Sequence, residues 1–484
     1  MHLQESKILG SESKRSGAKA TDVCVVSVAV YFLDVNTRCP LKFGREILTS
    51  VTCCRVRVTV RDRLGREAEG WGETPLSVQW AWPGSETYDF RHRAMRDFAL
   101  ALGEMWAGSN RYGHPMELGY DFLRAEAVEA FQAFSATSEG AGITHLAALI
   151  CASAFDIALH DAYGDLHEID TYLTYNRKFM NRDLAAYLVP AEDSKSDFHG
   201  RYPSDYLAKR PRITLPVWHL VGGLDPLDES DQRPDQSLDD GYPTTLTEWI
   251  IADGLKCLKV KLRGNDPDWD YDRLVGVARI AFPLGVVWLS ADFNCTVEEP
   301  QYVNDILDRL RDFAPDVYAH LLYVEQPFSY DLGASSLDVR SVSGRKPLFL
   351  DESADDWECV RLGRALGWTG VCLKTCKTQT GSLLSLCWAS AHGISLMVQD
   401  LTNPMLAQIS HLRLASHANT IMGVESNAMQ FYPQASLPEA AVHPGMYRRT
   451  DGTLNLGSLG NAGLGYRIQE IERTLPEPAG HFVA

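Results

Sequence analysis

Five short apolar runs set the predicted fold: LKVKL (258–262), VVWLSADFN (286–294), HLLYVEQP (320–327), PLFLDES (347–353) and GVCLKT (370–375). Each run ends in or near charged residues, which are Lys259, Lys261, Asp292, Glu325, Asp351 and Lys374. A charge at the end of a buried strand is costly to remove from water unless it is paired. These charges therefore need a structural or functional explanation.

Runs of this kind recur through residues 214–430 and alternate with helix-like segments. The strands are expected to begin near Pro216, Cys257, Val287, Leu321, Pro347, Gly370, Ser395 and Thr420. The clearest helix lies in VEEPQYVNDILDRLRDFAP (297–315), with a predicted capping box of Thr296 and Glu299. Eight strands alternating with helices predict an α/β fold, a parallel TIM-type barrel. An open doubly wound sheet is the alternative, but GNAGLG (460–465) has its glycines in the wrong order for dinucleotide binding.

An α+β unit is predicted before the barrel. Its strand patterns are VCVVSVAVYFLDV (23–35), SVTCCRVRVTV (50–60) and the return strand that ends GWGET (70–74). Residues 39–44 and 73–83 are predicted loops, and the second carries an exposed Trp80 that either lines a pocket or forms a hydrophobic cover. THLAALICASAFDIALHDAYG (144–164) is apolar on all sides, which predicts a buried helix.

The patterns divide the chain into five parts. They are a disordered tail (1–22), an N-terminal domain (23–164), an insertion or linker (165–213), the barrel (214–430) and a C-terminal segment (431–484). After Phe431 the periodicity breaks, and this last segment is predicted to fold back onto the N-terminal domain.

Composition argues against two classes of partner. With 46 Lys and Arg against 63 Asp and Glu, the 484-residue chain has a formal charge of −17. This acidic excess repels phosphate backbones and anionic lipid, so we expect neither nucleic acid nor a membrane surface as partner. We also expect no spanning helix, for want of a run of about 18 apolar residues. Eleven cysteines without framework spacing predict reduced thiols in a cytoplasmic protein.

Three of the charged strand ends are carboxylates. Asp292, Glu325 and Asp351 close the third, fourth and fifth predicted strands, whose C-terminal ends meet at one rim of a parallel barrel. Three like charges at close range repel and raise one another's pKa. A hard divalent cation removes that conflict, and oxygen ligands suit Mg²⁺. We therefore expect these three residues to bind Mg²⁺, although each alone would be an ordinary polar loop start.

The remaining charged strand ends are lysines. Lys259 and Lys261 are two residues apart on one strand, so both side chains face the same side. Adjacent ammonium groups lower at least one pKa, and a partly neutral lysine can act as a general base. Lys374, on the sixth strand, is expected across the barrel. A metal between lysines suits removal of a proton α to a carboxylate; the alternative is an ion-pair lattice in which the lysines only neutralise the carboxylates.

These residues resemble the enolase superfamily, and within it the muconate-lactonizing and dipeptide-epimerase branch. The motifs that match are KVK (259–261), Asp292 with Asn294, Glu325 followed by Gln-Pro, DES (351–353) and LKTCK (373–377). Outside the barrel strands, GWGE (70–73), SAFDIALHDAYG (153–164), LVGG (220–223) and the tail from DGTL to AGLG (451–465) also match. The resemblance covers roughly residues 23–471.

The resemblance implies a modified (β/α)7β barrel under an α+β capping domain formed by both ends of the chain. It implies Mg²⁺ on the three carboxylates, Lys261 and Lys374 as an acid–base pair, and Lys259 beside the substrate carboxylate. The superfamily stabilises an enediolate in this way. Two opposed lysines favour racemisation or epimerisation of a small carboxylate, such as an amino-acid derivative, a dipeptide or a hydroxy acid. A homo-oligomer is also expected.

Departures from the family pattern limit the reaction and leave the substrate open. Strand six ends in Lys374 and strand seven in Asp400, which argues against the His–Asp dyad of mandelate-racemase relatives. Glu425 and Asn427 stand where dipeptide epimerases have Asp-x-Asp. Candidate substrate contacts are Trp80, Asn294, Asp400, Asn403, Glu425 and Asn427. Cycloisomerisation, acid-sugar dehydration and a non-catalytic ligand-binding descendant remain alternatives.

Overall fold

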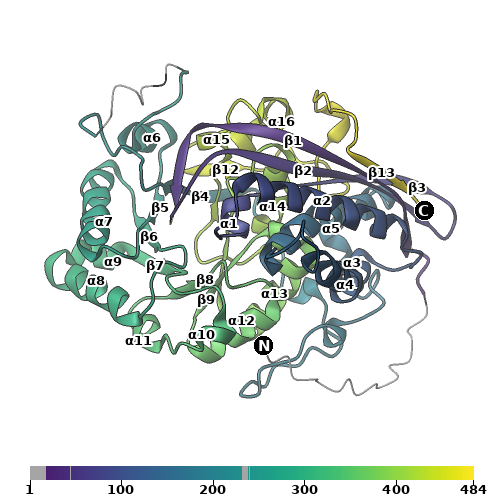
Figure 1. Cartoon of the computed structure of the whole chain (residues 1–484), viewed down its shortest axis with the longest axis horizontal. Coiled ribbons are helices and arrows are strands. Elements are labelled where there is room, and N and C mark those ends of the chain that lie inside the picture. Colours follow the sequence, from purple (N-terminus) through teal and green to yellow (C-terminus); the bar gives the residue numbers. More distant parts are fainter. Residues whose placement is uncertain (1–17, 44, 232–237, 239) are drawn as a thin grey trace.

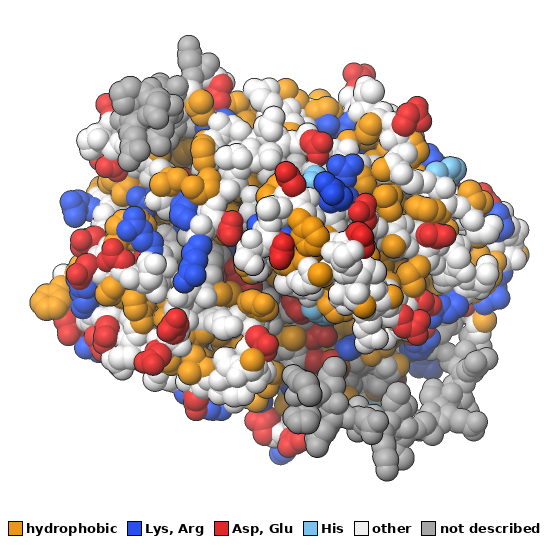
Figure 2. All heavy atoms as spheres, in the orientation of Figure 1, with side chains coloured by type: hydrophobic (Ala, Val, Ile, Leu, Met, Phe, Trp, Pro, Cys, Tyr) orange, Lys and Arg blue, Asp and Glu red, His pale blue; other side chains and the backbone are white. Residues whose placement is uncertain are grey.

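The computed structural model describes residues 18–43, 45–231, 238 and 240–484. These residues form a four-stranded antiparallel sheet with helices and a larger parallel sheet that curls into a barrel (Figure 1). Most of the predicted tail lies outside the described residues, but Lys19 Nζ donates to the carbonyl of Lys178 at 3.2 Å. Figure 2 shows acidic and basic side chains interspersed over one face, so the net charge of −17 is not gathered there in one patch.

The capping sheet has the strand order β13-β1-β2-β3. Its strands are β1 (Val23–Phe43), β2 (Glu46–Asp62), β3 (Glu67–Pro75) and β13 (Gly480–Val483). β13 pairs antiparallel with β1, with Val28 opposite Phe482. The prediction that the C-terminal segment returns to the N-terminal domain is confirmed by this pairing.

Two predicted loops of the cap are wrong. β1 continues to Phe43 through the predicted loop 39–44, of which Gly44 lies outside the described residues. Pro40 has no N–H to donate, and the register of β1 on β2 shifts between Asn36 and Leu41 to accommodate it. In the second loop, Trp80 lies on the short helix α1 (Val78–Ala81) and is 8% exposed, where an exposed side chain was expected.

Helices cover one face of the capping sheet, as Figure 1 shows. They are α2 (Tyr88–Ala107), α3 (Pro115–Arg124), α4 (Glu126–Ser135) and α5 (His145–Leu166). α5 is buried as predicted. By length and composition alone it could cross a membrane, but 94% of its apolar window is buried inside the protein, as in the core helix of a globular domain.

The barrel strands follow the predicted order. They are β4 (Thr214–Val221), β5 (Cys257–Lys261), β6 (Trp288–Asp292), β7 (Leu321–Glu325), β8 (Leu348–Leu350), β9 (Gly370–Leu373), β10 (Ser395–Val398) and β11 (Val424–Glu425). The paired order is β10-β9-β8-β7-β6-β5-β4-β11, and β12 (Thr453–Asn455) adds antiparallel to β4. β10 and β11 stand at the two ends of this order. A hydrogen bond of 2.9 Å from the Ile421 amide, just before β11, to the Leu396 carbonyl of β10 joins them. The predicted barrel is confirmed.

Helices alternate with these strands. They are α6 (Leu246–Asp253), α7 (Pro267–Ala281), α8 (Pro300–Phe313), α9 (Pro315–His320), α10 (Leu332–Ser335), α11 (Arg340–Ser343), α12 (Trp357–Leu366), α13 (Gln379–Ala391), α14 (Met405–His417), α15 (Ala428–Phe431), α16 (Leu437–Val442) and α17 (Pro444–Tyr447). The capping box predicted for α8 is wrong. The helix begins at Pro300, and Thr296 Oγ1 instead donates to the Phe293 carbonyl at 2.5 Å.

The segment 165–213 packs on the outside of the barrel. Its short 3₁₀ turns are Thr171–Thr174, Leu184–Ala186 and Pro203–Asp205. Tyr172 stacks on His417 of α14 with ring centroids 3.9 Å apart, and Trp388 of α13 donates from Nε1 to the Val189 carbonyl at 2.9 Å. These contacts tie the segment to two barrel helices.

Candidate functional site

The six charged strand ends meet at one rim of the barrel. The register pairs Lys261 with Asp292 and Asp292 with Glu325 on neighbouring strands. Asp351 follows β8, and Lys374 follows β9. All six side chains are buried, as parallel strand ends beneath a capping domain should be.

Lys259 lies at the centre of this cluster. Its Nζ donates to Glu325 Oε1 at 2.5 Å, Glu425 Oε2 at 3.0 Å and Gln399 Oε1 at 3.1 Å, and lies 3.1 Å from Asp292 Oδ2. Burial lowers the pKa of Lys259, but Asp292 and Glu325 outweigh burial and hold this pKa well above its usual value. The expected lowering is therefore absent at Lys259, because carboxylates surround its ammonium group.

Lys261 and Lys374 lie on separate parts of the rim. Lys261 Nζ donates to Asp292 Oδ2 at 2.5 Å. Lys374 Nζ donates to the Asp400 carbonyl at 3.0 Å, lies 3.2 Å from Asp351 Oδ2 and stands 5.3 Å from the ring centre of Trp80. Burial lowers the pKa of Lys374 and Asp351 raises it, with a net rise above its usual value. The expected lowering is absent here too.

The rim carries more buried acid than base. Among the described residues it holds six carboxylates and four ammonium groups: Asp292, Glu325, Asp351, Glu352, Asp400, Glu425, and Lys259, Lys261, Lys374, Lys377. Burial, followed by the charge of Asp292, raises the pKa of Glu325 well above its usual value. Burial, followed by the charge of Asp351, raises the pKa of Glu352 to about 7.

The donor set fits Mg²⁺ in its chemistry. Asp292, Glu325 and Asp351 offer oxygen ligands, which suit a hard divalent cation. Asp351 Oδ1 is buried without a hydrogen-bond partner, and so can accept a further ligand. In the side-chain positions described, no group of three His, Cys, Asp or Glu is arranged to hold a metal. Lys259 Nζ lies between the acids and would have to move aside.

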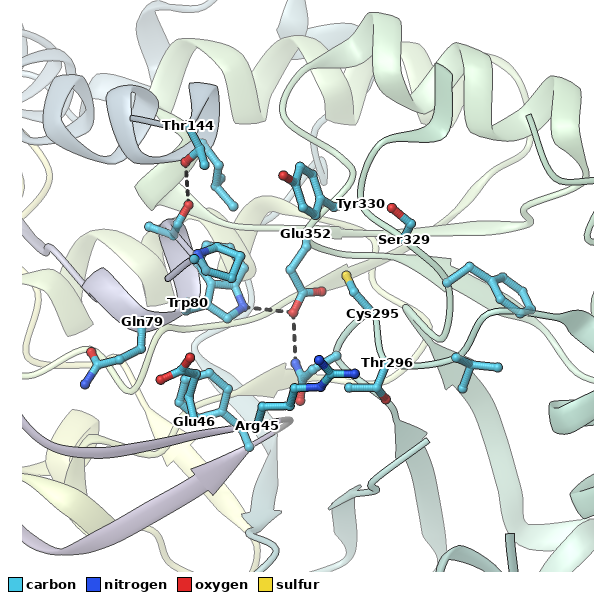
Figure 3. Close-up of a pocket in the computed structure, with 18 of the residues that line it drawn as sticks. Arg45, Glu46, Gln79, Trp80, Thr144, Cys295, Thr296, Ser329, Tyr330 and Glu352 are labelled. Atoms are coloured by element: carbon cyan, nitrogen blue, oxygen red, sulfur yellow. Dashed lines mark hydrogen bonds between the residues drawn. The ribbon is translucent and has the colours of Figure 1, made fainter. Parts of the chain in front are cut away.

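Two cavities open at this rim and share two aromatic walls. A chamber of about 40 Å³ is lined by charged groups that include Lys259, Lys261, Asp351, Lys374, Asp400 and Glu425. A second cavity, of about 710 Å³, extends between the capping domain and the loops after β6, β7 and β8. Phe43 and Trp80 line both cavities. In Figure 3 the indole of Trp80 points toward Glu352 in the lining of the larger cavity, and its Nε1 donates to Glu352 Oε1 at 3.0 Å.

The structure brings four of the six predicted substrate contacts to these cavities. Asp400 and Glu425 line the small chamber, whereas Trp80 and Asn294 line the larger cavity.

The other two predicted contacts face protein groups. Asn403 accepts from the Leu401 amide at 3.1 Å and donates to the Ala407 carbonyl at 3.3 Å, so it stabilises the turn before α14. Asn427 accepts from the Leu220 amide at 3.0 Å and donates to Glu425 Oε1 at 3.0 Å. Protein groups therefore hold both side chains.

Sequence reasoning missed several residues of the rim. Gln399 accepts from Lys259 and donates from Nε2 to Glu325 Oε2 at 2.7 Å. Lys377 donates to the Asp351 carbonyl. Glu352 accepts from Trp80 Nε1 and, at 2.9 Å, from Asn294 Nδ2. Lys377 and Glu352 lie within quoted motifs and Gln399 precedes Asp400, and that adjacency was the available signal.

Comparison with known proteins gives matches at the level of structure. No family model matches the chain, and no curated protein matches its sequence. The muconate lactonizing enzyme of Mycobacterium smegmatis, complexed with muconolactone, has a TM-score of 0.58 at 16% identity, covering 91% of this chain and 96% of that one. The N-succinyl Arg/Lys racemase of Bacillus cereus has a TM-score of 0.60 at 15% identity, covering 95% and 100%. The chain shares the fold of these two enzymes, a barrel beneath a capping domain.

A third structure with this fold is a complex with both a metal and a dipeptide. The dipeptide epimerase of Enterococcus faecalis, complexed with Mg and the dipeptide L-Leu-L-Tyr, has a TM-score of 0.57 at 15% identity, covering 91% of this chain and 99% of that one. These likenesses confirm the predicted barrel with its capping domain.

Proposed function

We propose that the chain is a Mg²⁺-dependent racemase or epimerase that removes and returns the proton α to the carboxylate of a small acid. The observation that carries this proposal is the chamber of about 40 Å³, which Lys261 and Lys374 line together with Lys259 and Asp351. Lys261 belongs to β5 and Lys374 follows β9, and three strands lie between them in the sheet. A substrate carbon in this chamber would have one lysine on each face.

The lysines supply the proton transfers. One lysine, neutral at the start, accepts the α-proton from one face of the carbon, while the ammonium group of the other donates a proton to the opposite face. The configuration at carbon is thereby inverted, and the two lysines exchange protonation states. Lys259 contributes a fixed positive charge beside the substrate carboxylate, which stabilises negative charge that develops on its oxygens.

Asp292, Glu325 and Asp351 are the residues that would hold Mg²⁺. When bound, the ion would bind the substrate carboxylate and offset the charge of Asp351, which raises the pKa of Lys374. Glu325 and Asp292 would then exchange their contacts with Lys259 for the ion, leaving Lys259 free to face the substrate. The likeness of the whole fold to racemase, epimerase and muconate lactonizing structures supports this assignment.

Exchange of the α-proton in heavy water tests the proposal. Wild-type protein with Mg²⁺ is incubated with a panel of N-acyl amino acids, dipeptides and 2-hydroxy acids, and deuterium uptake at Cα is followed by NMR. We expect exchange on at least one class, its loss on chelation, and a decrease of about 10²-fold or more in Lys261→Ala and in Lys374→Ala.

Lys195→Ala is the matched control, because this lysine is exposed and lies in the outer segment 165–213. It should retain wild-type exchange. Exchange that survives in both Lys261→Ala and Lys374→Ala, or no exchange by the wild type on any class, contradicts the proposed function.

A further inference from the structure

We propose that Gln399 is a positioning residue for the proposed reaction, and that its Oε1 orients the amine of Lys374 so that the lone pair of the amine faces the substrate carbon. This inference rests on the proposed function for the role of Lys374. Gln399 itself is fully buried and, among the described residues, is not one of those that line the small chamber. It would therefore act on the reaction through its neighbours and not by touching the substrate.

The sheet places Gln399 beside Lys374. β10 pairs parallel with β9, and Val398 at the end of one strand lies opposite Leu373 at the end of the other. Gln399 and Lys374 directly follow these two residues, and the Gln399 amide still donates to the Leu373 carbonyl at 3.0 Å. Since residues in register on neighbouring parallel strands point to the same face, both side chains enter the barrel at the same level.

The side-chain amide of Gln399 is held at both ends. Its Oε1 accepts from Lys259 Nζ at 3.1 Å and from Lys374 Nζ at 3.4 Å. Because an ammonium group only donates hydrogen bonds, the atom that faces the two lysines must be the oxygen. The nitrogen Nε2 then faces the other way and donates to Glu325 Oε2 at 2.7 Å and to the Tyr323 hydroxyl at 3.3 Å. These bonds fix the direction in which the oxygen points.

Two uncharged acceptors lie beside the amine of Lys374. They are Gln399 Oε1 at 3.4 Å and the Asp400 carbonyl at 3.0 Å, and the first bond is long, as hydrogen bonds of active sites often are before the substrate binds. Asp351 Oδ2, at 3.2 Å, is the third neighbour and would hold Mg²⁺ under the proposed function. A neutral amine has two N–H bonds and one lone pair. With both N–H groups directed at the uncharged oxygens, the lone pair is left to face the chamber that Lys374 lines.

The contacts of Gln399 with the lysines are one-sided. In the described part of the chain its Oε1 reaches Lys259 and Lys374. In that same part no hydrogen bond joins it to Lys261, whose Nζ donates to Asp292 Oδ2 at 2.5 Å. Lys259 would lie beside the carboxylate of either enantiomer, so a disturbance there should affect both enantiomers alike. Loss of the bond to Lys374 should affect only the enantiomer whose α-proton Lys374 removes.

Gln399→Met tests the inference, because methionine fills a similar space without either polar end. Exchange of the α-proton in heavy water with Mg²⁺ is measured separately on the two enantiomers of an accepted substrate, and Lys374→Ala identifies the enantiomer that depends on Lys374. For that enantiomer Gln399→Met should lower kcat by about tenfold more than for the other, while KM changes alike for both. Gln399→Asn keeps the amide but is one methylene too short to reach Lys374, so it should give the same one-sided loss and serves if the methionine variant does not fold.

Gln408→Met is the matched control. Gln408 is a fully buried glutamine of α14 that donates to Ser426 Oγ and, at 3.1 Å, to the Met446 carbonyl. The same loss of a buried amide at this position should leave the ratio of the two kcat values as in wild type. If Gln399→Met changes kcat by the same factor for both enantiomers, or lowers it more for the other enantiomer, the inference is overturned. An equal shift of the ratio in Gln408→Met overturns it as well.

Crystal structures separate this inference from the proposed function. If the wild type exchanges no compound of the panel, the proposed function fails, and the positions of the lysines in wild-type and Gln399→Met crystals decide the inference. Lys374 Nζ should then be displaced by about 1 Å or more relative to the Asp400 carbonyl, a shift large enough to misalign a reacting group, whereas Lys261 keeps its bond to Asp292. An unmoved Lys374 overturns the positioning role of Gln399.

Discussion

Lys259 illustrates how one buried ammonium group organises the rim. Three carboxylates lie within 3.1 Å of its Nζ, those of Asp292, Glu325 and Glu425. Removing one member of such a buried cluster leaves uncompensated charge, so its residues depend on one another. Acids outnumber lysines at the rim, and under the proposed function a divalent cation would offset part of this excess.

Mg²⁺ should therefore stabilise the folded protein. At a concentration 100 times its Kd the ion adds about 2.7 kcal/mol to the free energy of unfolding. Thermal denaturation with and without Mg²⁺ measures this as a rise in Tm. Asp351→Asn should lose the rise, whereas Asp272→Asn, at an exposed position on α7, should keep it. An equal rise in Asp351→Asn would place the ion elsewhere.

His114 predicts a loss of stability in acid. Burial lowers its pKa well below the usual value, with His160 adding to the effect, so the folded state keeps it neutral. The unfolded chain binds more protons below about pH 6.5, and stability therefore falls as pH decreases through that value. By pH 5 the loss is on the order of 2 kcal/mol for this group.

Urea unfolding at pH 7.5 and pH 5 checks this prediction in wild type and His114→Asn. Asparagine can still accept from the Met116 amide, as His114 Nδ1 does at 3.2 Å, but it does not titrate. Between pH 7.5 and pH 5 the free energy of unfolding should fall by about 2 kcal/mol less in the variant than in wild type. Equal losses would assign the acid sensitivity to other groups.

At the scale of elements, the close packing of β3 on α5 depends on two glycines. A Cβ on Gly72 would lie 2.1 Å from the Ala154 carbonyl oxygen, and one on Gly70 would lie 2.0 Å from the Ala162 amide nitrogen. Backbone atoms cannot move aside as a flexible side chain can. The GWGE motif is thus explained by contact between a strand and a helix.

Gly72→Ala should lower the free energy of unfolding by about 2 kcal/mol or more, because the strand must separate from the helix. Gly333→Ala on α10 is the matched control, since its nearest neighbour would be Asp331 Oδ1 at an ordinary 3.5 Å. That variant should lie within about 1 kcal/mol of wild type. Chemical denaturation compares the two, and equal stability would refute the packing argument.

The elements that the sequence predicted best are those with a local pattern. The barrel strands were located because each buried run ends in a charge or a turn. The prediction of a loop at Pro40 was wrong. Proline suggests a turn, but the pairing of β1 with β2 continues past it through a register shift. The capping box at Thr296 was wrong because the helix begins at Pro300, beyond the reach of that hydroxyl.

Side-chain roles at the site were harder to predict than the strands. Asn403 and Asn427 are polar and near strand ends, yet nearby backbone groups bind them. The large cavity joins Glu46, Trp80, His145, Asn294 and Glu352 from five separate segments. Only tertiary packing brings these together, so no spacing in the sequence could have indicated it.

At the scale of the whole molecule, a buried ion cluster fastens the cap to the rest of the chain. Arg55 of β2 pairs with Glu73 of β3 and, at 3.1 Å, with Glu439 of α16. Glu73 Oε1 also accepts from the Ala407 amide of α14 at 3.3 Å. One cluster therefore connects the capping hairpin, the C-terminal segment and a barrel helix.

Arg55→Met should lower the free energy of unfolding by about 3–5 kcal/mol, because Glu73 would be left buried without its cation. The control is Arg61, which lies on β2 like Arg55 and pairs with Glu67 of β3. Arg61→Ala removes this ion pair, but both of its side chains are nearly half exposed. Arg61→Ala should lower the free energy of unfolding by about 1 kcal/mol or less. Similar losses in both variants, measured by denaturant unfolding, would refute a special role for the buried cluster.

The central claim is that Lys261 and Lys374 serve opposite faces of one substrate carbon. Its most direct test is α-proton exchange in heavy water, measured separately on the two enantiomers of an accepted substrate. Lys261→Ala should abolish exchange of one enantiomer and spare more of the other, and Lys374→Ala should show the reverse preference. If both variants lose exchange of the same enantiomer, or if each variant loses exchange of both enantiomers equally, the two-faced arrangement is contradicted.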